Sequence, residues 1–132
     1  MAGIFAKIAA GEIPSYKIAE DDRFLAFLDI SPLKKGHTLV IPKKEVDYIF
    51  ELDNETYLGL MAFSKHVAEA IKKATGCKKV SLQVIGLEVP HAHVHLIPIN
   101  SMNDANFSNE KLKFTKEEFE ETAKFIASHF SF

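Results

Sequence analysis

The sequence has a single cysteine, Cys77, and no tryptophan among its 132 residues. One cysteine excludes an intramolecular disulfide and any zinc finger, and it favours a reducing compartment. No stretch approaches the roughly 20 apolar residues that a membrane-spanning helix needs. The N-terminus also lacks the charged start and unbroken apolar run of a signal peptide. These absences predict a cytoplasmic protein with no membrane partner.

The sequence has no strong charge of either sign. Sixteen Lys and Arg against eighteen Asp and Glu leave a net charge of −2, so no global field would attract nucleic acid. Glycine-rich phosphate loops and Gly-x-Ser-x-Gly elbows are absent, which excludes P-loop and α/β-hydrolase sites. No repeat, linker or low-complexity tract divides the chain. Residues 1–132 are therefore predicted to form one domain.

The hydrophobic patterns predict an α+β fold, with a five-stranded antiparallel sheet covered by helices on one side. A short amphipathic helix is expected over residues 4–10, and a long central one from the N-cap Asp53 to the stop at Gly76. A capping box of Thr115 and Glu118 should open a C-terminal helix. The expected strands, separated by turn residues, cover residues 16–19, 24–28, 37–41, 80–85 and 92–99.

Histidine is the residue with an unusual arrangement, because three of the six histidines occupy positions 91, 93 and 95. Successive side chains of a strand point to opposite faces, so these three would share one face and the apolar residues between them the other. We expect the apolar set to face the core and the imidazoles to face outward. His66 and His129 are expected to be surface or packing residues.

Two chemistries fit this spacing. Imidazoles at alternate positions suit zinc, with a third imidazole or a carboxylate completing the site. Alternatively, one neutral imidazole is a nucleophile, and an acceptor holds the proton of its second nitrogen. Side chains about 6.6 Å apart on a straight strand do not converge easily on one ion. The spacing therefore favours one reacting histidine with flanking helpers.

The heptapeptide HAHVHLI resembles the motif of the histidine triad (HIT) superfamily, His-φ-His-φ-His-φ-φ. The segment IFAKIAAGEIPSYKIAEDDRFLAFLDISPLKKGHTLVIPKK is similar to the N-terminal half of the histidine triad nucleotide-binding proteins. The similarity runs over about residues 4–99. Residues 100–132 form an extension whose helix rests on the sequence pattern alone.

The resemblance implies a homodimeric nucleotide hydrolase or transferase that needs no metal and no cofactor. It would cleave at the α-phosphorus of nucleoside phosphoramidates or dinucleoside polyphosphates. His93 would attack phosphorus to give a nucleotidyl-histidine intermediate, which water then cleaves. His95 would donate a hydrogen bond to the phosphate or leaving group, and His91 would orient His93 through its backbone carbonyl. His37 matches a fourth histidine, on the neighbouring strand.

The resemblance also implies a site for a purine nucleotide. Asp29 matches the carboxylate that binds the ribose hydroxyls, since a carboxylate can accept two hydrogen bonds. An apolar clamp for the base and a looser set of binding positions before the triad complete this site. They are, in order, Phe5, Ile8, Phe27 and Ile30, and then Gln83, Gly86, Glu88 and Val89.

The sequence departs from the family pattern in two places. The Cys-x-x-Cys that completes a zinc site in many bacterial members is replaced by Gly3 and Ala6, so we expect no structural zinc. The Gly-Gln-Ser or Gly-Gln-Thr that supplies phosphate donors is replaced by residues 86–90, where Glu88 brings a negative charge. A nucleotide-binding module with little catalysis is therefore a second hypothesis. A metal-dependent hydrolase is a third, weakened by the few carboxylates near the triad in sequence.

Overall fold

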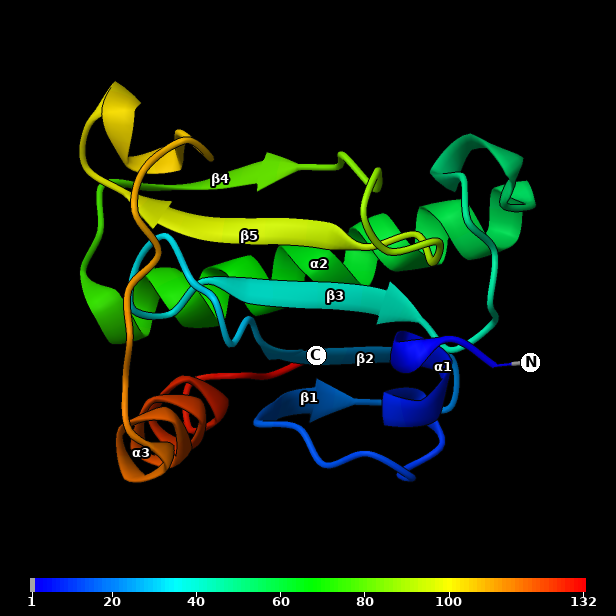
Figure 1. Ribbon diagram of the computed structural model, residues 1–132, viewed down its shortest axis with the longest axis horizontal. Coiled ribbons are helices and arrows are strands. Elements are labelled where there is room, and N and C mark those ends of the chain that lie inside the picture. The colour runs from blue at the N-terminus through cyan, green and yellow to red at the C-terminus, as the bar shows by residue number, and fades with distance from the viewer. Residues whose placement is uncertain (1) are drawn as a thin grey trace.

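The structure is a computed structural model that describes residues 2–132. A five-stranded antiparallel sheet of strand order β1-β2-β3-β5-β4 combines with three α-helices (Figure 1). This architecture confirms the predicted α+β fold. Among the described residues, no helix is long and apolar enough to cross a membrane. The strands are β1 (Lys17–Glu20), β2 (Phe24–Leu28), β3 (Thr38–Pro42), β4 (Lys79–Gln83) and β5 (Val94–Ile99).

The long helix α2 (Asn54–Thr75) lies behind the sheet in Figure 1. Its predicted ends are confirmed: the Asp53 side chain accepts a hydrogen bond from the backbone N–H of Thr56, and Gly76 ends the helix at a φ of 68°. The left-handed region is open to glycine without steric cost. The buried stripe of α2, which includes Leu60 and Ile71, packs against the face of the sheet that carries the main core.

The C-terminal helix α3 (Lys116–Ala127) begins at the predicted capping box of Thr115 and Glu118. It packs against β1 and α2 at the edge of the sheet. The Phe119 ring stacks on Tyr16 with ring centroids 5.0 Å apart. Two 3₁₀ turns, Ile49–Glu51 and Met102–Ala105, lie in the connections before α2 and after β5.

The prediction that the helices cover one side of the sheet is wrong for the first helix. Helix α1 (Ile4–Ala9) packs in front of the sheet, on the face opposite α2 (Figure 1). Phe5 and Ile8 form a second apolar cluster there with strand residues of β2 and β3. Every residue of these two strands is buried, because both faces of the sheet are covered at this point. A hydrophobic run buried on both faces has no alternation from which sidedness could be predicted.

Two predicted strands are longer than the observed ones. β5 begins at Val94 rather than at position 92, and β4 ends at Gln83 rather than at position 85. The end of β4 and the start of β5 are linked by their pairing. Gln83 is the register partner of His95, and no described residue of β4 beyond Gln83 is paired with β5. Val84 and Ile85 are exposed. His91 and His93 therefore lie in the irregular segment that leads into β5.

Candidate active site

Four histidines gather on the face of the sheet that carries α1. His95 lies on β5, His91 and His93 lie in the segment before β5, and His37 directly precedes β3. All four are buried, with exposed fractions of 1–8%. The expectation that the imidazoles face outward toward solvent is therefore wrong. Their face is covered by α1 on one side and by an aromatic ring of the C-terminal segment on the other.

His93 is held in one orientation and one tautomer. Its Nδ1 lies 2.7 Å from the backbone carbonyl oxygen of His91. A carbonyl oxygen only accepts, so Nδ1 must carry the proton, and Nε2 of the neutral ring keeps a free lone pair. The Phe5 ring packs edge-on against His93 with centroids 5.1 Å apart. His93 is thus a fixed imidazole whose free nitrogen is available as a nucleophile.

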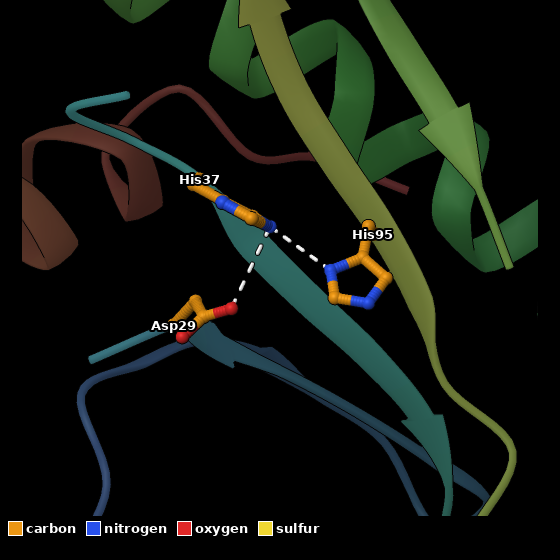
Figure 2. Close-up of side chains that lie close together, drawn as sticks. All are labelled: Asp29, His37 and His95. Atoms are coloured by element: carbon orange, nitrogen blue, oxygen red, sulfur yellow. Dashed lines mark hydrogen bonds and ion pairs between the residues drawn. The ribbon is translucent and has the colours of Figure 1, made fainter. Parts of the chain in front are cut away.

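The tautomer of His95 is set by a chain of hydrogen bonds that starts at a backbone amide. The N–H of Leu33 donates to Nδ1 of His37 at 3.0 Å, so neutral His37 carries its proton on Nε2. That Nε2 lies 3.0 Å from Nδ1 of His95 (Figure 2). His37 therefore donates to His95, and the proton of His95 is on Nε2. Nε2 of His95 is therefore a hydrogen-bond donor, whereas Nε2 of His93 carries a free lone pair.

Asp29, directly after β2, is the acidic neighbour of this pair. Its Oδ2 lies 3.6 Å from Nε2 of His37, as Figure 2 shows. Its Oδ1 accepts a hydrogen bond from the backbone N–H of Ser31 at 2.8 Å. The Asp29 side chain is 19% exposed, whereas that of His37 is 1% exposed. The carboxylate is thus positioned by the turn that follows β2 and remains open to a ligand.

Burial keeps His37 and His95 neutral. Desolvation lowers the pKa of His95 to about 3, and the nearby His37 and His93 act in the same direction. Desolvation also lowers the pKa of His37 to about 4, against the opposing effect of the Asp29 charge. Removal from water disfavours the charged form of a base. At neutral pH both rings are uncharged, as the hydrogen-bond chain requires.

His91 supports the site through its backbone and its ring. The Nε2 proton is donated to the carbonyl oxygen of Pro42, at the end of β3, over 2.7 Å. Burial lowers the pKa of His91. Nδ1 is buried without a hydrogen-bond partner among the described residues. The ring thereby ties the segment before β5 to β3 and holds the carbonyl that orients His93.

Among the described residues, one group has the geometry to hold a metal ion: Asp29, His37 and His95. One ligand atom from each lies within 4.8 Å of the others. However, Nδ1 of His37 already uses its lone pair to accept the proton of the Leu33 amide. A metal on Nε2 would require a second lone pair and so an imidazolate anion. The hydrogen bonding fits a relay between the histidines better than a metal centre.

Three of the four residues expected to clamp a base lie together. Phe5 and Ile8 of α1 pack with Phe27 of β2, and the Phe5 and Phe27 rings are 5.7 Å apart. Ile30 lies outside this cluster and is 71% exposed. The arrangement gives the α1 end of the site an apolar wall, with Ile30 in the adjoining loop.

The four binding residues expected before the triad lie in different surroundings in the structure. Gln83 is the register partner of His95, and its side-chain amide donates to the carbonyl oxygen of Ala105 at 3.3 Å. Val89 packs against the apolar cluster on α1 and accepts the N–H of His91 at 2.8 Å. Gly86 makes a turn at a φ of 68°. Glu88 is exposed on the surface of this loop.

Sequence reasoning missed an aromatic residue of the C-terminal segment. Phe107 packs edge-on against His95 with centroids 4.9 Å apart, and lies 6.1 Å from the His37 ring. The signal was present, since Phe107 is a lone aromatic in a polar stretch of Asn, Asp and Ser. An isolated aromatic in a polar loop indicates a buried contact, although the sequence alone does not identify the residues that it contacts.

Comparisons with known proteins identify the family of this chain and several of its relatives. The family model of the HIT domain matches residues 10–102. Adenosine 5'-monophosphoramidase hnt1 of Schizosaccharomyces pombe is 39% identical over 99 residues, 74% of this chain and 74% of the relative. An uncharacterized HIT-like protein of Borreliella burgdorferi is 36% identical over 132 residues, 94% of this chain and 95% of the relative.

A solved structure is similar over nearly the whole chain. The HIT-like protein involved in cell-cycle regulation from Bartonella henselae has a TM-score of 0.84 and 34% identity, and the match covers 97% of this chain and 96% of that chain. A match of this extent includes most of residues 100–132. The likeness to known proteins therefore reaches beyond residues 4–99, the part that the resemblance in sequence covers.

Proposed function

The chain belongs to the HIT domain family, and from this premise we propose that it is a nucleotide hydrolase or transferase acting at the α-phosphorus through a covalent intermediate on His93. The observation that carries the proposal is the pair of opposite tautomers: a lone pair on Nε2 of His93 beside a proton on Nε2 of His95. The name of the fission yeast relative, an adenosine 5'-monophosphoramidase, supports a nucleoside phosphoramidate as substrate.

In the first step, Nε2 of His93 attacks the α-phosphorus, and the bond to the leaving nitrogen or oxygen breaks. The leaving atom takes the electron pair of that bond, accepts a hydrogen bond from the Nε2 proton of His95 and takes its own proton from water. The nucleotidylated His93 keeps its Nδ1 proton and is cationic, and the carbonyl oxygen of His91 at 2.7 Å stabilises this charge. One difficult displacement is thereby split into two easier ones.

In the second step, water attacks the same phosphorus and the bond to Nε2 of His93 breaks. The electron pair returns to Nε2, and the attacking water gives up a proton to solvent, so His93 and His95 end in their starting tautomers. The nucleoside monophosphate is released. Asp29 would bind the ribose hydroxyls, and the wall of Phe5, Ile8 and Phe27, with Ile30 beside it, would hold a purine base.

The decisive experiment compares His93→Ala with the control His66→Ala, which lies on α2 away from the site. We expect His93→Ala to abolish hydrolysis of adenosine 5'-phosphoramidate and His66→Ala to retain it. Mass spectrometry of rapidly quenched wild-type enzyme should detect an adenylyl adduct on the peptide that contains His93. Addition of EDTA should leave the rate unchanged. Full activity of His93→Ala contradicts the mechanism, and loss of activity in EDTA supports a metal-dependent hydrolase.

A nucleotide-binding module with little catalysis is the second candidate. It is favoured by residues 86–90, which carry no hydroxyl or amide side chain to hold a phosphate. Calorimetry with AMP alongside the turnover assay separates the two functions. Tight binding without turnover identifies the module.

We also propose that the chain forms a homodimer through β4. This strand is at the edge of the sheet, and its outer side is unpaired in the described chain. Leu82 is 43% exposed on β4, and Ile85 is 48% exposed just beyond its end. An exposed apolar edge strand is a ready surface for pairing with a second copy.

A further inference from the structure

The segment that follows β5 is built against the histidine face. Phe107 is the aromatic residue of this segment that touches both rings of the relay, His95 at 4.9 Å and His37 at 6.1 Å. Phe5 of α1 packs on His93 instead, with ring centroids 5.1 Å apart. Phe107 is therefore the ring that covers the relay, whereas Phe5 covers the nucleophile His93.

The segment is tied at both ends to elements that carry site residues. Asp104 forms an ion pair with Lys34 at 3.0 Å, in the loop that leads to His37. The carbonyl oxygen of Ala105 accepts from Gln83, the register partner of His95. Further on, the N–H of Leu112 donates to the carbonyl oxygen of Pro32 at 2.8 Å. These bonds fix the segment over the relay.

A lysine inside the segment holds Phe107 in place. Nζ of Lys111 donates to the carbonyl oxygens of Phe107 at 2.6 Å and Asn109 at 3.2 Å. It also lies 5.9 Å from the centre of the Phe107 ring. These two hydrogen bonds close residues 107–111 into a tight loop. The loop holds the Phe107 ring against His95.

We propose that Phe107 is a positioning residue for the reaction, which excludes water from the hydrogen bond between His37 and His95 and so keeps the proton of His95 on Nε2. The expected effect of Phe107 on the reaction rate rests on the proposed function. The expected effect on the tautomer of His95 does not, because it follows from the contacts of Phe107 alone.

The physical argument is competition by water. A water molecule beside Nδ1 of His95 can donate to it or accept from it, so both tautomers of His95 would become populated if the ring of Phe107 were removed. Water would also solvate the charged form of the ring and raise the pKa of His95 toward the ordinary histidine value. The charged and titratable groups that face this pair are Asp29, His93 and Lys111.

The test uses NMR of the imidazole nitrogens and does not depend on turnover. In the wild type, His95 should show one Nε2–H tautomer and no titration between about pH 5 and 8. Phe107→Ala should mix the tautomers and bring the titration of His95 into this range. Phe107→Leu, which fills most of the volume, should behave like the wild type. Phe125→Ala on α3, where the side chain is 56% exposed, is the matched control.

Kinetics with adenosine 5'-phosphoramidate provide the second measurement. A misplaced hydrogen-bond donor should lower kcat of Phe107→Ala by about tenfold to a hundredfold while KM stays within about twofold. An unchanged His95 tautomer and titration in Phe107→Ala overturns the proposal, and so does a Phe107→Leu variant that behaves like Phe107→Ala. If the wild type turns over no nucleotide, the proposed function fails, whereas the NMR result still decides the role of Phe107.

Discussion

A histidine that accepts a hydrogen bond from a backbone amide is committed to one tautomer. His37 receives the N–H of Leu33, and this single bond decides where the protons of His37 and His95 lie. The amide is held by the fold, because Leu33 is buried in the loop between β2 and β3. The tautomer of His95, the proposed hydrogen-bond donor to the substrate, thus depends on a backbone group of the fold.

Asp29 offers a test of nucleotide recognition at the residue scale. Asp29→Asn removes the charge that strengthens hydrogen bonds to ribose hydroxyls, and hydrogen bonds to charged groups contribute about 1.5 to 3 kcal/mol. We expect the Kd for AMP, measured by calorimetry, to rise by about tenfold to a hundredfold. Asp22→Asn, at an exposed position in the turn between β1 and β2, should leave Kd unchanged.

A second ligand makes this test specific for the ribose. Asp29→Asn should bind AMP and a dideoxy analogue with similar affinity, because the group that distinguishes them has been weakened. The wild type should prefer AMP. An equal loss of affinity for both ligands in the variant would show that Asp29 acts through the fold rather than through the ribose.

At the scale of elements, local signals predicted the fold well. The N-cap Asp53, the stop at Gly76 and the capping box at Thr115 are confirmed because each depends on bonds to residues a few positions away. The strand ends at Gln83 and Val94 could not be predicted, since they depend on where two distant segments stop pairing. The face occupied by α1 was missed for the same reason.

The candidate site shows the same difference between local contacts, which could be predicted, and contacts between distant segments, which could not. The triad spacing and the resemblance were sufficient to predict that the carbonyl of His91 lies at the His93 ring, since the two residues are close in sequence. The burial of the histidines was not predicted, because it results from α1 and Phe107 packing over them. Contacts between segments that are far apart in sequence leave at most a weak mark, such as a lone aromatic in a polar stretch.

At the scale of the whole molecule, the neutral histidines make stability depend on pH. His37 and His95 have folded pKa values of about 4 and about 3, below their ordinary value of 6.5. Between pH 6.5 and about 4 the unfolded chain binds protons that the folded chain does not, so stability is lost as pH falls. Each imidazole lowers the free energy of unfolding by up to about 1.4 kcal/mol per pH unit.

Urea unfolding between about pH 5 and 7 measures this slope in a range where carboxylates contribute little. His95→Gln should make the dependence on pH shallower, by up to about 1.4 kcal/mol per pH unit. His66→Gln, in the middle of α2, serves as the matched control and should keep the wild-type slope. An identical slope in His95→Gln and the wild type would mean that His95 is not a buried neutral base.

The open edge of the sheet determines how two copies could assemble. Strand pairing along β4 would satisfy the backbone groups of the edge and cover Leu82, which is 43% exposed. In a two-fold symmetric dimer each β4 contacts the other, so Leu82→Glu introduces two carboxylates at one interface. Light scattering after size exclusion should give twice the chain mass for the wild type and a monomer for Leu82→Glu.

The control for this experiment is Leu58→Glu, because Leu58 is 64% exposed and belongs to α2 rather than to β4. It should remain a dimer. Circular dichroism of both variants separates a lost interface from a lost fold. A monomeric wild type refutes the dimer. A Leu82→Glu variant that stays dimeric would show that the interface lies on another surface. Two buried carboxylates would strongly destabilise a pairing of the two β4 strands.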